Sequence, residues 1–98
     1  MTHVRLWRFV VPPAREARFI AAYGSQGDWA QLFRQARGFL RVELWRGEDG
    51  SFLTADHWQS SDDFDHFQAS LGPRYHALDA ELEGLASEES FIDAFDTA

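Results

Sequence analysis

The sequence predicts one α+β domain in which a four-stranded antiparallel sheet carries helices on one face. The chain has 98 residues, so a single domain over residues 1–98 accounts for all of it. Strand-like alternation occurs near both ends and in the middle, and two regions of helical periodicity separate these segments. The implied order is strand, helix, strand, strand, helix, strand (βαββαβ), which is the ferredoxin-like arrangement.

The first strand and the first helical region follow from local spacing. Residues 3–11 alternate between two faces, and a pair of prolines then ends the strand. Helical spacing runs from Ala14 to Tyr23 and is interrupted by a glycine-containing segment. A second short helix is expected to begin at Asp28 and to end before Gly38.

Residues 39–46 and 51–58 are expected to form a hairpin around the loop GEDG. A two-residue turn would place Glu43 opposite Asp56, which are two like charges. A four-residue loop would instead place Arg41 opposite Asp56. Cross-strand pairs differ by roughly 0.2–1 kcal/mol each, so the sequence favours the four-residue loop and a structural Arg41–Asp56 pair.

The longest helical signal begins after Ser60, which has the character of an N-cap, and two acidic residues lie in its first turn. Apolar positions then recur every three or four residues from Phe64 to Leu85. Gly72-Pro73 falls inside this stretch, so we expect a break or kink there. A weak alternation over residues 89–95 is typical of a short closing strand.

Alternation along the strands assigns side chains to the two faces of the sheet. We expect the helices to cover the aliphatic face: Val4, Leu6, Val10, Leu40, Val42, Leu44, Leu53 and Ala55. The other face gathers aromatic rings and charges, and so large an aromatic patch is unusual on the surface of a monomer. We therefore predict a homodimer joined sheet to sheet. The residues expected to face the partner are Trp7, Arg41, Trp45, Asp56 and Trp58.

Composition argues against several functional classes. The net charge is −7, divided into +5 over residues 1–46 and −12 over residues 47–98, and the basic residues form no stripe suited to nucleic acid. There is no cysteine, no phosphate loop and no histidine pair with zinc-helix spacing, so we expect no metal. No apolar run reaches the ~20 residues that span a membrane, and no signal-peptide pattern is present, so we expect a cytoplasmic protein.

Four segments resemble the antibiotic biosynthesis monooxygenase superfamily of dimeric α/β barrels. They read AAYGSQGDWAQLF, RGFLRVELWR, FLTADHWQSSDDFDHF and RYHALDAELEGL, and the likeness covers nearly the whole chain. Its most specific parts are Trp58 with Ser60 and Phe64 after it, and Gly38-Phe39 at the start of a strand. Activities in this superfamily include cofactor-free oxidation of polycyclic phenols or quinols, haem degradation and isomerisation.

The resemblance implies an oxidoreductase that acts on a small aromatic, quinol-like molecule without metal or flavin. In such oxygenases the electron-rich substrate supplies the reducing power, while the protein contributes an apolar cavity, a proton acceptor and hydrogen-bond donors. Alternation turns His57 toward the helices and helical placement sets His76 beside Tyr75, so either histidine is a candidate base. The candidate pocket residues are Tyr23, Trp29, Phe33, Phe67 and Tyr75.

Each candidate also has a purely structural interpretation. His57 could be a hydrogen-bonded histidine at a strand end, and His76 could form a solvated ion pair with Asp79. The aromatic set has spacings that build ordinary cores. If Phe33, Phe67 and Tyr75 filled the cavity, the chain would instead be a non-catalytic binder of small hydrophobic molecules or a structural dimer module.

The haem-degrading branch of the superfamily is the third alternative. In that branch His76 would correspond to the iron ligand. Phe67, however, stands where those members have a tryptophan, and Leu6 or Trp7 stands where they have an asparagine. Because the chain contains no asparagine at all, haem degradation is the less favoured interpretation.

Overall fold

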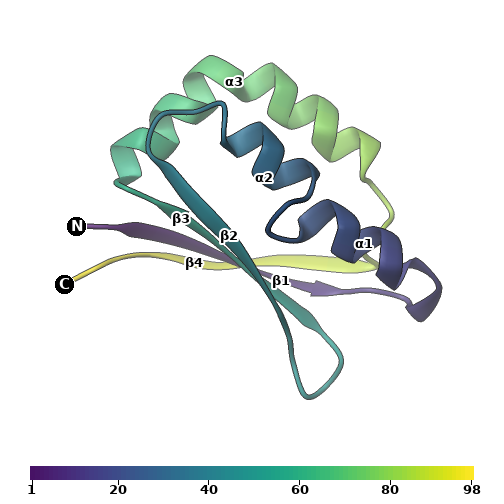
Figure 1. Cartoon of the computed structure of the whole chain (residues 1–98). Coiled ribbons are helices and arrows are strands. Elements are labelled where there is room, and N and C mark those ends of the chain that lie inside the picture. The colour runs from purple at the N-terminus through teal and green to yellow at the C-terminus, as the bar shows by residue number, and fades with distance from the viewer.

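The computed structural model describes all 98 residues and has the predicted ferredoxin-like α+β fold. Its elements, in chain order, are β1 (His3–Val10), a short 3-10 helix (Pro13–Arg15), α1 (Glu16–Tyr23), α2 (Asp28–Phe33), β2 (Phe39–Arg46), β3 (Phe52–Trp58), α3 (Ser61–Glu81) and β4 (Glu88–Asp96). The strands are antiparallel in the order β2-β3-β1-β4. All three α-helices lie on one side of this sheet (Figure 1).

On β1 and β3 the helices cover the aromatic face, which is the reverse of the prediction, whereas on β2 they cover Val42 and Leu44 as predicted. Phe9 packs against Phe19 and Tyr23 of α1, with ring centroids 5.2 and 5.0 Å apart. Trp58 is fully buried beneath the helices. Aromatic rings bury more apolar area per residue than valine or leucine does, so covering this face removes more apolar surface from water.

This exchange of faces corrects the predicted dimer surface. Trp7, Asp56 and Trp58 lie under the helices, together with Phe9, so they cannot face a partner across the open side of the sheet. Arg41 and Trp45 do lie on the open side. The aliphatic side chains of β1 and β3 share that open side with them.

The β2–β3 register also differs by one residue from the prediction. Val42 lies opposite Asp56, and Arg41 lies opposite His57. A one-residue slip carries every side chain of a strand to the other face of the sheet. As a result Val42 points under the helices with Asp56, and the expected Arg41–Asp56 pair does not form.

The hairpin loop explains this register. The Gly47 N–H donates to the Ser51 carbonyl at 2.7 Å, which leaves three residues in the loop instead of four. Gly50, the last of them, has a φ of +86°, the left-handed conformation that three-residue hairpin loops require. The Asp49 carboxylate accepts from the Ser51 N–H at 2.9 Å. These backbone preferences outweigh the side-chain pairing on which the prediction relied.

Helix α3 is continuous through Gly72-Pro73, so the predicted break is wrong. A proline removes one N–H and leaves the carbonyl four residues earlier, that of Ala69, without its helical partner. Ala69 and Pro73 are both exposed, so water can reach this carbonyl. Packing on both sides of the proline, by Phe67 before it and Leu82 after it, holds the helix together.

None of the helices has both the length and the apolar character that a membrane-spanning helix needs.

The Ser60 cap gives a prediction for stability. The Ser60 hydroxyl accepts from the Asp63 N–H at 3.1 Å and donates to the Asp63 carboxylate at 3.0 Å. Ser60→Ala should lower the free energy of unfolding by about 1 kcal/mol, as loss of an N-cap typically does. Ser61→Ala, one residue further on, is the matched control in urea denaturation. Equal midpoints for the two variants would contradict the capping role.

Candidate active site

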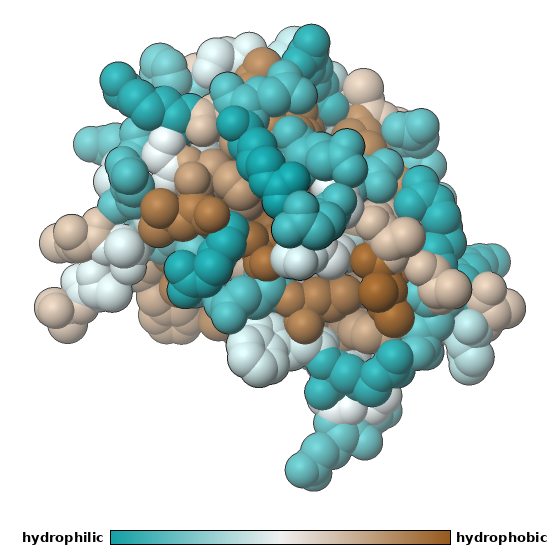
Figure 2. Space-filling model, in the orientation of Figure 1, coloured by the Kyte–Doolittle hydropathy of each residue, from teal (hydrophilic) through white to brown (hydrophobic).

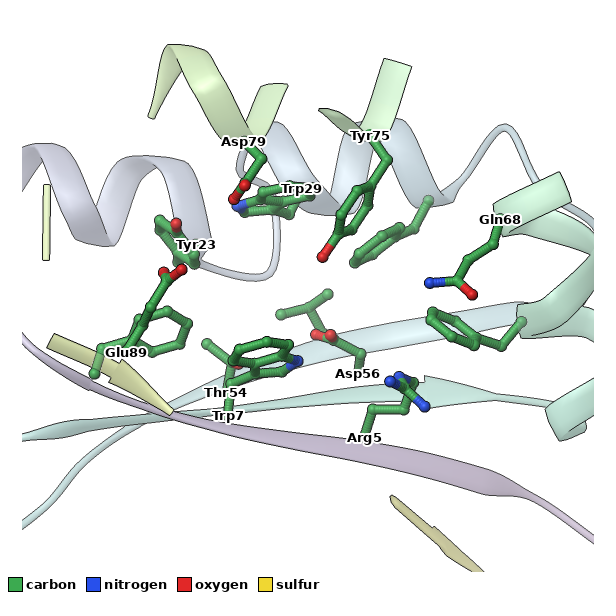
Figure 3. A pocket seen from close by; sticks show the side chains of 14 residues that line it. Arg5, Trp7, Tyr23, Trp29, Thr54, Asp56, Gln68, Tyr75, Asp79 and Glu89 are labelled. Carbon is green, nitrogen blue, oxygen red and sulfur yellow. The ribbon is translucent and has the colours of Figure 1, made fainter. Parts of the chain in front are cut away.

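A partly open cavity of about 200 Å³ lies between the sheet and the helical layer. Its floor comes from β1 and β3, and its roof from α2 and α3 (Figure 3). Apolar residues reach the surface across the middle of the molecule, between the helices and the sheet (Figure 2). An apolar cavity of roughly 150 Å³ accepts benzene, so this one has room for a substituted aromatic ring.

The predicted pocket residues separate into wall and core. Tyr23, Trp29, Phe33 and Tyr75 line the cavity. Phe67 does not, because it is fully buried behind the wall, where its ring meets that of Phe33 edge to face at 5.2 Å. The five aromatic residues therefore do not fill the space between sheet and helices.

Neither candidate histidine lies in this cavity. His57 points to the open side of the sheet, where its Nε2 atom lies 2.5 Å from the Glu43 carboxylate. The prediction that His57 faces the helices is wrong, because its neighbours Asp56 and Trp58 take that side. His76 is exposed on α3, with its ring edge against Tyr75 at 5.6 Å, and borders a neighbouring groove.

The acidic group at the floor of the cavity is Asp56. Its carboxyl projects from β3 into the cavity (Figure 3). No side chain or backbone group of the protein forms a hydrogen bond with it, and no cation lies within 4.0 Å of it. Burial raises the pKa of Asp56 to about 7, although the positive charge of Arg5 acts in the opposite direction. A carboxyl with this pKa exchanges protons near neutral pH.

Arg5 lies directly opposite Asp56 on β1. Its guanidinium carbon is 4.0 Å from the ring centroid of Phe64 and 4.7 Å from that of Phe91, so aromatic faces hold it in place. Burial lowers the pKa of Arg5, but an arginine side chain remains charged at neutral pH. Because it forms no ion pair with Asp56, its donors remain available to a ligand.

Neutral hydrogen-bond donors complete the cavity. The Tyr75 hydroxyl points into it from α3 (Figure 3), and burial raises the pKa of this phenol. Burial likewise raises the pKa of Tyr23 to about 12, so both phenols keep their protons. The indole N–H of Trp29 is buried without a well-aligned hydrogen bond, and it lies close enough to the Tyr23 hydroxyl to oppose the rise in the pKa of that phenol. The cavity thus combines the carboxyl of Asp56 with a fixed cation and neutral donors, and two further carboxyls, those of Asp79 and Glu89, belong to its lining.

Sequence reasoning missed Asp56 and Arg5 for one reason. Alternation places Asp56 and Arg5 on the face that carries the aromatic rings, and the sequence-based prediction gives that face to a dimer partner. The alternation of Asp56 with Trp58 was itself a usable signal. Once Trp58 is recognised as a residue to be buried by the helices, Asp56 must point the same way.

The raised pKa of Asp56 predicts a pH-dependent gain in stability for Asp56→Asn. The wild-type protein loses stability as pH rises from 3.8, the ordinary pKa of aspartate, to about 7. Over this range Asp56 is ionised in the unfolded chain but stays protonated in the folded protein, so the unfolded state is favoured. Asp56→Asn should melt higher at pH 8, by on the order of 5 °C, and the difference should vanish near pH 4. Glu48→Gln, which removes one exposed charge, is the control. A difference that does not depend on pH would contradict this assignment.

Comparison with known proteins agrees with the geometry. The family model described as "Antibiotic biosynthesis monooxygenase" matches residues 2–80. A variant of SnoaB, a cofactor-independent oxygenase from Streptomyces nogalater, is 27% identical with a TM-score of 0.68, over 98% of this chain and 95% of that one. A putative antibiotic biosynthesis monooxygenase from Bordetella bronchiseptica is 20% identical with a TM-score of 0.72, over 99% and 97% of the two chains. No curated protein matches. The chain belongs to the antibiotic biosynthesis monooxygenase family.

Proposed function

We propose that this protein is a cofactor-independent monooxygenase that oxidises a small electron-rich aromatic molecule, such as a phenol or quinol. The observation that carries the proposal is the unpaired carboxyl of Asp56, which has a pKa of about 7 and lies in an aromatic-walled cavity beside Arg5. This arrangement supplies a proton acceptor and a fixed positive charge in one place. Family membership and the likeness to SnoaB support the same reaction class.

Asp56 begins the proposed reaction by removing a proton from the bound aromatic molecule. The resulting anion gives one electron to O₂, and the substrate radical and superoxide combine to form a carbon–oxygen bond. Proton return gives a hydroperoxide, which loses water to leave a carbonyl group. In a phenol the carbon that reacts is a ring C–H carbon ortho or para to the hydroxyl, so the phenol and O₂ become a quinone and H₂O. The substrate supplies all the electrons.

The other cavity residues stabilise charge and exclude water. Arg5 faces Asp56 across the floor, so its guanidinium lies where the substrate anion develops. The Tyr75 hydroxyl donates from the roof, toward the same region (Figure 3). The rings of Trp29 and Phe33 pack with centroids 5.8 Å apart and form an apolar wall against which an aromatic substrate can stack.

The protonation of Asp56 predicts the pH dependence of the reaction. A general base must be ionised, so kcat/KM for oxygen uptake with a panel of hydroquinones should rise with pH, with a midpoint near 7. Asp56→Asn should lower the rate by roughly 10²–10⁴-fold at pH 8, because it keeps the shape of the side chain but cannot accept a proton.

Two histidine variants serve as controls for this experiment. His57→Ala alters the opposite face of the sheet, and His76→Ala alters an exposed position outside the cavity. Both should retain most of the oxygen uptake. An Asp56→Asn variant as fast as wild type would remove Asp56 from the mechanism. Binding of aromatic molecules without any oxygen uptake would favour the alternative function, a non-catalytic binder of small hydrophobic ligands.

We also propose that the protein forms a homodimer through the open side of the sheet. This side carries half-exposed aliphatic residues, including Leu6 and Leu53, and more exposed aromatic ones, Trp45 and Phe95. Such a face is apolar enough to favour burial against a second copy. The proposed partner surface is therefore the aliphatic side, opposite to the side inferred from the sequence.

A charged residue in the middle of the open side tests the homodimer. Leu6→Asp should convert a dimer to a monomer in light scattering, because it would bury an unpaired carboxylate at the contact. The position is half-exposed in the single chain, so folding should survive, which circular dichroism can verify. Ala17→Asp, on the exposed side of α1, is the control. A monomeric wild type at micromolar concentration would refute the proposal.

A further inference from the structure

A second hollow borders the cavity at the end away from Arg5. This groove of about 370 Å³ runs between the end of α3 and the start of β4. It shares three residues with the cavity, namely Tyr23, Asp79 and Glu89. Because the two hollows have these residues in common, a ring in the cavity could extend a substituent into the groove. Asp79 and Glu89 lie at this end with Tyr23 (Figure 3).

This junction carries negative charge that the protein does not neutralise. Neither Asp79 nor Glu89 has a cationic partner within 4.0 Å. Burial raises the pKa of Glu89, and the nearby charge of Asp79 raises it further, which indicates that the two carboxyls repel each other. Glu83 and Glu88 add to the charge along the groove. The one basic side chain of the cavity, Arg5, lies at its other end (Figure 3).

Aromatic rings border the same junction. The ring centroid of Trp29 lies 6.1 Å from that of Tyr23 and 5.1 Å from that of Tyr75. Electron-rich aromatic faces attract organic cations, and the attraction is strongest for tryptophan. The indole N–H of Trp29 is buried at this end, close to the Tyr23 hydroxyl, so these rings form one fixed aromatic wall at the junction.

We infer that the preferred substrate is an aromatic phenol whose side chain carries a protonated amine, held between Asp79, Glu89 and the neighbouring aromatic rings. The inference rests on the proposed function, since it takes the ring to lie at Asp56 and Arg5. A carboxylate in place of the amine would face two carboxyls, so anionic phenols are rejected.

His76 is the remaining titratable side chain at the groove. It lies on α3 beside Tyr75 and borders the same groove as Asp79 and Glu89. The preference for a cation is therefore measured near neutral pH and at low ionic strength, where salt does not screen the carboxylates.

Three matched phenols test the inference by isothermal titration calorimetry. Tyramine, tyrosol and 4-hydroxyphenylacetate share one ring and carry an ammonium, a hydroxyl and a carboxylate. Tyramine should bind at least about tenfold more tightly than 4-hydroxyphenylacetate, which corresponds to about 1.4 kcal/mol, with tyrosol in between. Added salt should reduce this ratio.

Single variants locate the preference. Asp79→Asn and Glu89→Gln should each lower the ratio between tyramine and 4-hydroxyphenylacetate and leave the binding of tyrosol within about twofold. Glu48→Gln removes the same charge from the distant hairpin loop and should leave the ratio unchanged.

Several outcomes would overturn the inference. They are equal or tighter binding of the acid, no binding of any of the three phenols, or a tyramine preference that survives both junction variants. The experiment measures binding without turnover. An inactive protein that still prefers tyramine would therefore refute the oxygenase proposal alone, and an active oxygenase without the preference would refute only this inference.

Discussion

Burial of Trp58 is the constraint on which the rest of the structure depends. Its indole is fully buried and packs against Phe33, Phe64 and Phe67, with ring centroids 5.4–5.5 Å away. These rings come from α2 and α3, so Trp58 joins the last residue of β3 to both helices. Since side chains alternate along a strand, fixing Trp58 under the helices also fixes Asp56 there. The packing of one tryptophan thereby places the carboxyl of the candidate site.

The same constraint explains how the cavity tolerates charged groups. Asp56 and Arg5 occupy adjacent strands in the middle of the sheet, where a fully apolar core would be more stable. Aromatic packing on both sides of them supplies the stability, through the cluster at Trp58 and through Phe9, Phe19 and Tyr23 at the other end. Loss of stability at a functional position is a common feature of active sites. The fold can therefore keep an open, partly charged space between two well-packed aromatic clusters.

Sequence patterns predicted the elements well and the faces poorly, for a physical reason. Caps, glycines and periodicity are local signals, so the Ser60 cap and the strand and helix order could be recognised directly. Which face of the sheet is covered depends on contacts between distant elements, and both faces contained enough apolar residues to form a core. The register of β2 was decided by the backbone conformation of Gly50, a contribution that side-chain pairing does not include. Alternation with the wrong face covered therefore predicts His57 at the cavity, where the structure has its neighbour Asp56.

The exchange of faces also changes the meaning of His57. Its imidazole, the Glu43 carboxylate and the Arg41 guanidinium form a polar group on an otherwise aliphatic side of the sheet, with Arg41 Nε 3.8 Å from Glu43. If a second copy covers this side, these groups enter the contact already paired, so their burial leaves no charge uncompensated. If the two sheets met in an offset arrangement, this polar group would lie against leucine or valine of the second copy, and other apolar residues of the open side would stay exposed. In the proposed dimer, His57 would therefore be a contact residue that keeps the Glu43 carboxylate paired.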